Sequence, residues 1–189
     1  MSIGLRMERL RRTPDEIATA IAGKSDAALG RRPAERQWSP TEIICHLRDV
    51  EELFRIRFHT ILALDEPKIL TFNAEPALLA VWGIGGVSDS ALGSPSAAPR
   101  TTVGHPLDPD RWAEERQYAR SDPNQALTAF RRQRTETVAL LESLTDAQWL
   151  RGGIHLRLGR LTLGDWVASL AAHDDNHLDQ LTRAIDGRA

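Results

Sequence analysis

Two histidines near the carboxyl end of the chain, His173 and His177, are spaced four residues apart. If this stretch is helical, the two residues lie one turn apart on the same face, so their imidazole rings can converge on one cation. Gln180 follows on the same side and could orient a ligand or contact a substrate, or be only a polar residue near the helix end. The spacing indicates half of a metal site, because chelation needs at least a third ligand.

The best third candidate is His46, which lies far upstream in another segment with helical periodicity. Three imidazole nitrogens suit a divalent transition metal, with zinc or nickel preferred and iron, manganese or cobalt as alternatives. Three protein ligands leave one or more coordination positions for water or substrate, so the predicted site would bind or react rather than only stabilise the fold. A metal there could acidify a water molecule or a thiol, or polarise a carbonyl group.

Other residues near these histidines have simpler interpretations. Asp49 and Asp174 could support the ligands through hydrogen bonds, but carboxylates on the solvated face of a helix are the preferred interpretation. Cys45 points about 100° away from its neighbour His46 around the helix, which favours a small buried side chain over a ligand.

Several further side chains are predicted to have ordinary roles. Arg57 and Arg116 could receive an anionic substrate, although surface or ion-paired positions are expected for them. Surface or loop positions are predicted for the other histidines, and packing roles for the tryptophans: His59, His105, His155, Trp38, Trp82, Trp112, Trp149 and Trp166.

The elements that carry the three histidines are predicted to be long amphipathic helices. Ser39, Pro40 and Glu42 form a strong helix start, and apolar residues at helical spacing continue it to about Leu64. The helix that carries the histidine pair is predicted to start at Thr162, with Asp165 completing a capping box, and to reach about Ile185.

Two further long helices complete the predicted fold. Thr13 and Pro14 predict a helix start that continues to about Leu29, and Asp122 and Pro123 predict another that ends near residues 145–146. A short helix is expected at residues 110–116, and residues 148–160 are interpreted as a loop, since no second clear strand accompanies the alternating residues 154–158. The prediction is an all-α four-helix bundle.

The chain is 189 residues long, which fits one domain with a single sizeable core. Residues 83–106 are low in complexity and are predicted to form an irregular or mobile insertion between the second and third long helices. The formal charge of −2 and the lack of a basic stripe argue against nucleic-acid binding. No signal peptide or membrane-spanning run is evident, and the single cysteine fits a reducing compartment, so the cytoplasm is predicted.

Several motifs resemble the DinB-like (DinB/YfiT-type) superfamily of four-helix-bundle metalloproteins. They are residues 38–47, residues 113–118, and residues 159–163 leading to residues 173–180. In this family one histidine comes from the second helix and an H-x-x-x-H pair from the last, so the resemblance gives His46, His173 and His177 the metal role. It covers nearly the whole chain except residues 83–106.

The resemblance also implies a function class and a partner. Members of the family are commonly dimeric, and they include thiol-dependent S-transferases and isomerases that use low-molecular-weight thiols. We therefore expect a divalent-metal-dependent enzyme acting on a small molecule, with thiol-dependent transfer as the most concrete reaction and a homodimer as the expected assembly. The alternatives are a metal-dependent hydrolase and a non-catalytic, metal-binding stress-response bundle.

Overall fold

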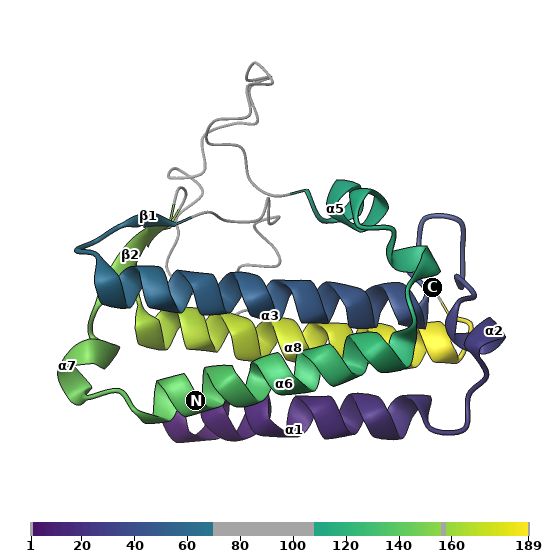
Figure 1. The fold of residues 1–189 in the computed structure, drawn as a ribbon, viewed down its shortest axis with the longest axis horizontal. Coiled ribbons are helices and arrows are strands. Elements are labelled where there is room, and N and C mark those ends of the chain that lie inside the picture. The colour runs from purple at the N-terminus through teal and green to yellow at the C-terminus, as the bar shows by residue number, and fades with distance from the viewer. Residues whose placement is uncertain (1, 70–107, 156–157, 189) are drawn as a thin grey trace, which may run out of the picture.

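The computed structural model describes residues 2–69, 108–155 and 158–188. Four long helices pack side by side as a bundle (Figure 1): α1 (Ile3–Ile21), α3 (Pro40–Ala63), α6 (Pro123–Glu142) and α8 (Leu163–Ile185). The predicted four-helix bundle is confirmed. The predicted insertion at residues 83–106 lies outside the described residues, so its character stays a prediction.

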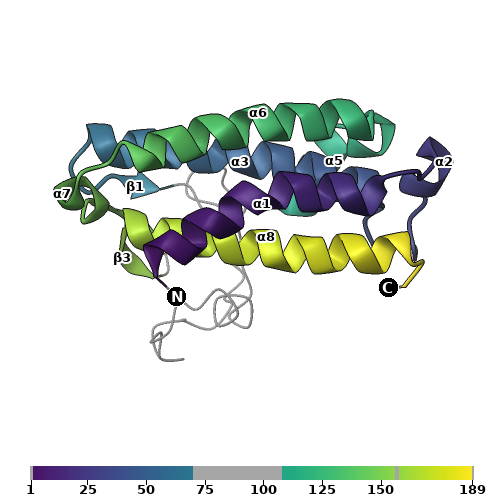
Figure 2. The same ribbon diagram turned by 90° about the horizontal axis from the view of Figure 1, so that it is seen from below.

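The order of the helices around the bundle differs from their order in the chain. α3 packs against α6 and α8, and α1 packs against the same two helices from the opposite side (Figures 1 and 2). α3 and α6 run in the same direction, whereas α3 and α8 are antiparallel. Two parallel neighbours cannot be joined by a tight turn, which agrees with the long stretch of sequence between the end of α3 at Ala63 and the start of α6 at Pro123.

Three of the four helix starts agree with the sequence signals. Ser39 and Glu42 form a capping box at α3, Thr162 and Asp165 form one at α8, and the Asp122 side chain caps α6. Each cap satisfies backbone N–H groups that have no partner within the helix, which fixes the residue at which the helix begins. The predicted ends of α3 and α8 are also confirmed.

The predicted start of the first helix is wrong, because α1 begins at Ile3 and has Pro14 in its interior. The proline leaves the Leu10 carbonyl without its usual helical donor. That carbonyl instead accepts a hydrogen bond from Arg134 Nη1 at 2.8 Å, so the helix continues through the proline. Thr13 does not cap the helix, since its hydroxyl lies 2.6 Å from an Asp174 carboxylate oxygen.

The first helix also ends earlier than predicted. α1 stops at Ile21, and Gly23 takes a positive φ of 70° in the turn that follows. The short helix α2 (Asp26–Leu29) then starts afresh with a Ser25 cap.

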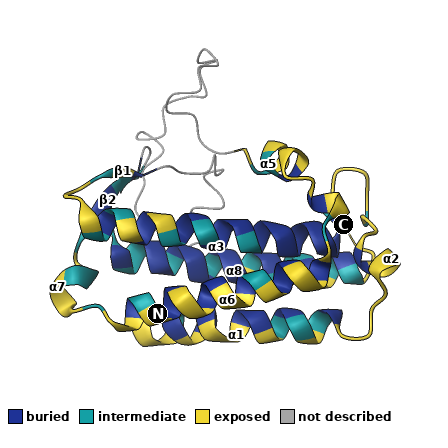
Figure 3. Ribbon diagram, in the orientation of Figure 1, coloured by how far each residue is buried: buried dark blue, intermediate teal, exposed yellow. Residues whose placement is uncertain are grey.

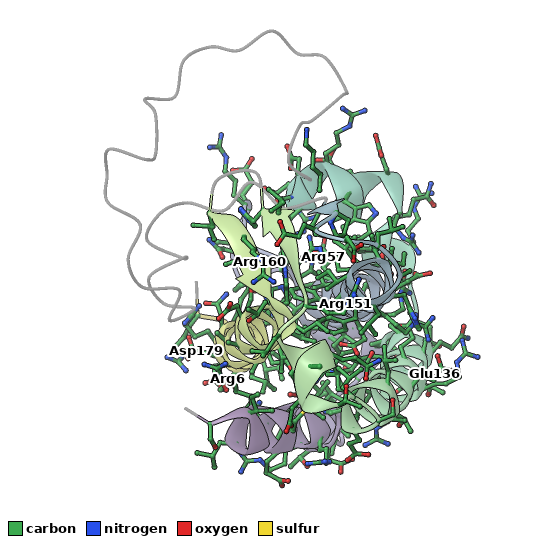
Figure 4. The ribbon with its side chains drawn as sticks, turned by 90° about the vertical axis from the view of Figure 1, so that its left-hand side faces the viewer. Arg6, Arg57, Glu136, Arg151, Arg160 and Asp179 are labelled. Atoms are coloured by element: carbon green, nitrogen blue, oxygen red, sulfur yellow. The ribbon has the colours of Figure 1, made fainter. Side chains whose placement is uncertain are left out.

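The interpretation of residues 148–160 as a loop is wrong in its central part. β2 (Gly152–His155) pairs antiparallel with β3 (Gly159–Thr162) and parallel with β1 (Lys68–Ile69), giving a three-stranded sheet. This sheet lies at the end of the bundle that Figure 4 faces, where Arg151 and Arg160 are labelled. Arg151 ties the sheet to α3, because its guanidinium donates to the carbonyls of Ile61 and Leu64.

Short helices complete the described part of the chain. The helix predicted at residues 110–116 is present as α5 (Pro109–Glu115), and it leads into the 3₁₀ turn η1 (Tyr118–Arg120). Thr145 does not close α6 as predicted, since α6 ends at Glu142 and Thr145 caps α7 (Asp146–Trp149).

The core consists of two apolar clusters separated by a polar layer. One cluster, with Leu10, Val50, Val138 and Ala171, lies toward the sheet, and the other lies toward the opposite end. The second cluster takes one or more buried residues from each long helix: Ile17, Leu47, Phe130 and Leu181 among them. Between the two clusters every long helix contributes buried polar residues, and buried positions run along all four helices in Figure 3.

Within the described residues, no helix is both long enough and apolar enough to cross a bilayer.

Replacement of Gly152 by alanine should destabilise the fold by roughly 1–3 kcal/mol. A Cβ atom at this position would lie 2.6 Å from the backbone oxygen of Leu161, which cannot move without disturbing the pairing of β2 with β3. The measurement is the free energy of unfolding in urea. The control is Gly4→Ala in α1, where a Cβ atom would be 4.0 Å from its nearest neighbour and should be neutral or stabilising. Equal effects for the two variants would contradict the prediction.

Candidate metal centre

The three predicted ligands converge between α3 and α8. His46 comes from α3, His173 and His177 come from successive turns of α8, and all three side chains are buried. The Nε2 atoms of His46 and His173 lie 3.2 Å apart, and one potential ligand atom from each of the three residues lies within 4.8 Å of the others. Three nitrogen donors this close together can share one cation, as the sequence predicted.

The helix caps set the positions of these side chains. His46 lies seven residues after the Ser39 cap, and His173 lies eleven residues after the Thr162 cap, so each falls a fixed number of turns into its helix. Because α3 and α8 are antiparallel neighbours, the early turns of α3 face the late turns of α8. A shift of either helix by one residue would rotate a ligand by about 100° and break the site.

Burial keeps the three imidazoles neutral. Burial is the main cause that holds the pKa values of His46 and His173 well below 6.5. Repulsion from His177 in its protonated form is the next cause. Burial also lowers the pKa of His177 to about 4, against the opposing effects of Gln180 and Asp174. A neutral imidazole has a free lone pair, which is the form that binds a metal. The donor set, its burial and its neutral state therefore fit a divalent transition-metal ion.

Gln180 orients one of the three predicted ligands, His177. Its Oε1 atom lies 2.7 Å from His177 Nδ1, and an amide oxygen can only accept, so His177 carries its proton on Nδ1. The lone pair of His177 is then on Nε2. This is the orienting role that the sequence left open for Gln180.

Trp38 forms a wall of the histidine cluster. Its ring centroid lies 4.7 Å from that of His46, and its plane is within 12° of the His177 ring at 6.3 Å. Its indole Nε1 donates to Asp110 at 3.0 Å. The sequence predicted packing for Trp38 but gave no sign that it packs against the ligands, because it lies eight residues from His46 and outside the helix.

Both the sequence and the fold of this chain have counterparts among known proteins. The family model described as the DinB superfamily matches residues 9–181. The chain belongs to the DinB superfamily. No curated protein matches the chain.

The DinB fold of this chain also has a counterpart among solved structures. YfiT from Bacillus subtilis, described as a probable metal-dependent hydrolase with an unusual four-helix bundle topology, superposes with a TM-score of 0.72. The match covers 97% of this chain and 87% of YfiT, at 20% sequence identity. At that identity the likeness establishes the shared fold.

The interpretation of Asp49 and Asp174 as solvated residues of this DinB bundle is wrong, since both are buried. Asp49 accepts from Tyr118 at 2.7 Å and forms ion pairs with Arg48 and Arg116. Asp174 is paired with a buried arginine of α6. Amphipathic periodicity could not show this, because the partners that cover the carboxylates come largely from distant segments: Tyr118 and Arg116 for Asp49, and the arginine of α6 for Asp174.

Several secondary predictions have mixed outcomes. Cys45 is buried and Arg116 is ion-paired, as expected, and His59 is exposed. His155 is not a surface residue, because it is buried in β2 with its ring 5.8 Å from Trp166. Arg57 is likewise buried, with its guanidinium 4.6 Å from the Phe54 ring centroid, and burial lowers its pKa to about 9. His105 lies outside the described residues.

A cavity of about 610 Å³ adjoins the wall that Trp38 forms. Charged groups of both signs line it, including Arg36, Arg120, Glu42 and Glu114. Trp38 contributes to this cavity and also contacts the histidine cluster, so it links the two features.

The metal-free protein should lose stability as the pH falls from about 7.5 to about 5.5. The three clustered histidines, here called the triad (His46, His173 and His177), have lower pKa values in the folded protein than the ordinary value of about 6.5 that applies in the unfolded chain. In this window the unfolded chain binds more protons than the folded protein does. The free energy of unfolding, which is highest above about pH 6.5, therefore falls by about 1 kcal/mol per histidine as the pH is lowered. The measurement is urea unfolding with a chelator present.

A comparison of variants isolates the histidines responsible for this pH dependence. His177→Ala should show a shallower dependence than the wild type, whereas His59→Ala at an exposed position should keep the full dependence. A wild-type free energy of unfolding that is constant across this window would contradict the assignment of neutral, buried histidines.

Proposed function

We propose that this protein is a divalent-metal-dependent enzyme that acts on a small molecule, with His46, His173 and His177 as the metal ligands. The single observation that carries the proposal is the convergence of three buried histidines within 4.8 Å of one another. Among the described residues no carboxylate or cysteine joins this group, so the protein supplies three ligands and a fourth would come from a bound small molecule. A non-catalytic binding protein would be expected to close the site with a fourth ligand.

The preferred reaction is transfer of a low-molecular-weight thiol to an electrophilic substrate. A bound divalent metal supplies Lewis acidity, which lowers the pKa of a thiol or a water molecule. A thiol has an ordinary pKa of about 8.5 and needs little assistance, whereas water, with a pKa near 15.7, usually benefits from a nearby base. Asp49 and Asp174 are both engaged by arginines, so neither is free to act as that base.

The chain's own residues would bind and orient the reactants. Gln180 holds the proton of His177 on Nδ1, and Trp38 supplies an aromatic wall beside the ligands. The charged cavity next to Trp38 can hold the polar remainder of a small molecule. In the transfer, a bond forms between the thiol sulfur and carbon, the bond to the leaving group breaks, and the thiol proton passes to solvent.

Hydrolysis is the second candidate, and the specific observation in its favour is the shared fold with YfiT, which is described as a probable metal-dependent hydrolase. The same three ligands would serve either reaction, and the two differ in the nucleophile. A homodimer in the cytoplasm remains the expected state of the protein.

The first test is the metal content of the purified protein, measured by plasma mass spectrometry. The wild type should carry about one divalent ion per chain, and the triple variant His46→Ala, His173→Ala, His177→Ala should carry essentially none. His59→Ala is the matched control, because this exposed histidine of α3 should not affect the content. Equal metal content in the wild type and the triple variant would refute the proposed site.

The second test distinguishes the two reactions. The metal-loaded protein is assayed for conjugation of cysteine or glutathione to a haloacetamide and, separately, for hydrolysis of a nitrophenyl ester. Thiol transfer should fall at least about 100-fold when the metal is stripped or His177 is replaced by alanine. A metal-dependent rate in the ester assay alone would favour the hydrolase, and no metal-dependent rate in either assay would favour a non-catalytic protein.

A further inference from the structure

A buried ionic cluster of Glu51, Arg134 and Asp174 lies in the polar layer of the bundle. The three residues are at most 2% exposed. Arg134 contacts Asp174 through two hydrogen bonds of 2.6 and 3.1 Å, and it contacts one Glu51 oxygen from Nε at 2.9 Å and from Nη2 at 2.8 Å. The cluster therefore joins α3, α6 and α8 through a single guanidinium.

The first long helix completes the cluster. Arg134 Nη1 also donates to the Leu10 carbonyl at 2.8 Å, the group that Pro14 leaves without a helical donor. The Thr13 hydroxyl lies 2.6 Å from Asp174 Oδ2. With these contacts each nitrogen of the guanidinium donates at least one hydrogen bond, and all four long helices meet at one residue.

This cluster lies on the same two helices as the proposed histidine ligands. Asp174 follows His173 in α8 and precedes His177 by three residues, and Glu51 lies on α3 five residues after His46. Both helices that carry the ligands are thus held by the same arginine. A rotation of α8 that displaced His173 would also break the paired contact between Asp174 and Arg134.

The numbers of positive and negative groups in the cluster are unequal. Two carboxylates and one guanidinium sum to a net charge of −1 at a buried position. Glu51 Oε1 makes no hydrogen bond with any residue that the structure describes, so one carboxylate is only partly compensated. Charges in a poorly solvated interior act on one another more strongly than in water. Beyond the larger effect of burial, the charge of Arg134 lowers the pKa of His173, whereas the charge of Asp174 raises the pKa of His177, so the cluster presents both signs to the histidines.

We propose that Glu51, Arg134 and Asp174 are positioning residues of the metal centre, which fix the relative rotation of α3 and α8. The inference rests on the proposed metal site, and it adds residues that touch neither metal nor substrate. Paired arginine and carboxylate contacts are specific in geometry, which distinguishes this cluster from ordinary apolar packing.

The hold of Arg134 on α3 is tested with Glu51→Gln, which keeps the size of the side chain and an oxygen for Arg134 but removes the ionic contact. The measurement is the dissociation constant of the metal-free protein for Zn²⁺ and Co²⁺ in competition with a chelator. Glu51→Gln should weaken both about 10-fold. The matched control is Glu52→Gln, which makes the same change at the next, partly buried residue outside the cluster and should stay within about twofold of the wild type.

The geometry is tested with Arg134→Lys, which keeps the charge but replaces a planar group with one that cannot bind both carboxylates in the same way. The visible absorption spectrum of bound Co²⁺ reports ligand geometry, so it should change in position or intensity, with affinity also lower by about 10-fold. Thermal unfolding of both variants, followed by circular dichroism, confirms that the measurements are made on folded protein.

The outcomes separate this inference from the proposed function. If the wild type binds Co²⁺ through the triad but both variants keep its affinity and spectrum, the inference is refuted and the metal site stands. If Arg134→Lys does not fold, the affinity of Glu51→Gln relative to Glu52→Gln decides alone. If the wild type binds neither metal, the proposed function fails and the inference falls with it.

Discussion

The contact between Arg134 and Asp174 is the interaction on which the interior of this bundle depends. A buried guanidinium is costly unless its donors all have acceptors, and here α1, α3 and α8 supply them. Burial alone would lower the pKa of Arg134, but the two carboxylates raise it above its ordinary value, so it stays charged. Apolar side chains can slide past one another with little penalty, whereas these contacts specify one arrangement of the four helices.

The helix arrangement explains why ligands so distant in the sequence can meet. Parallel α3 and α6 require a long return connection, and this leaves α8, the last helix, to pack antiparallel to α3. His46 and His173 are 127 residues apart yet have Nε2 atoms 3.2 Å apart. The apolar clusters on either side of the polar layer hold the helices together, and the polar layer sets their rotation.

Local signals predicted what depends on local contacts. The capping boxes at Ser39 and Thr162 involve residues three positions apart, so both helix starts could be predicted. The four-residue spacing of His173 and His177 within one helix likewise predicted that the two side chains lie together. The strand at residues 152–155 was missed because one of its partners, β1, lies more than 80 residues upstream. The burial of Asp49 and Asp174 was missed for the same physical reason: Tyr118, which donates to Asp49, and Arg134, which pairs with Asp174, are distant in the sequence.

Pro14 has a consequence for how this chain can change over evolutionary time. The proline and Arg134 share one carbonyl: the proline leaves it free, and the arginine binds it. An amino acid with an N–H at position 14 would restore the helical bond and compete with the arginine, while loss of the arginine would leave the carbonyl buried without a donor. Substitutions at the two positions, which lie 120 residues apart, are therefore expected to be correlated among related sequences.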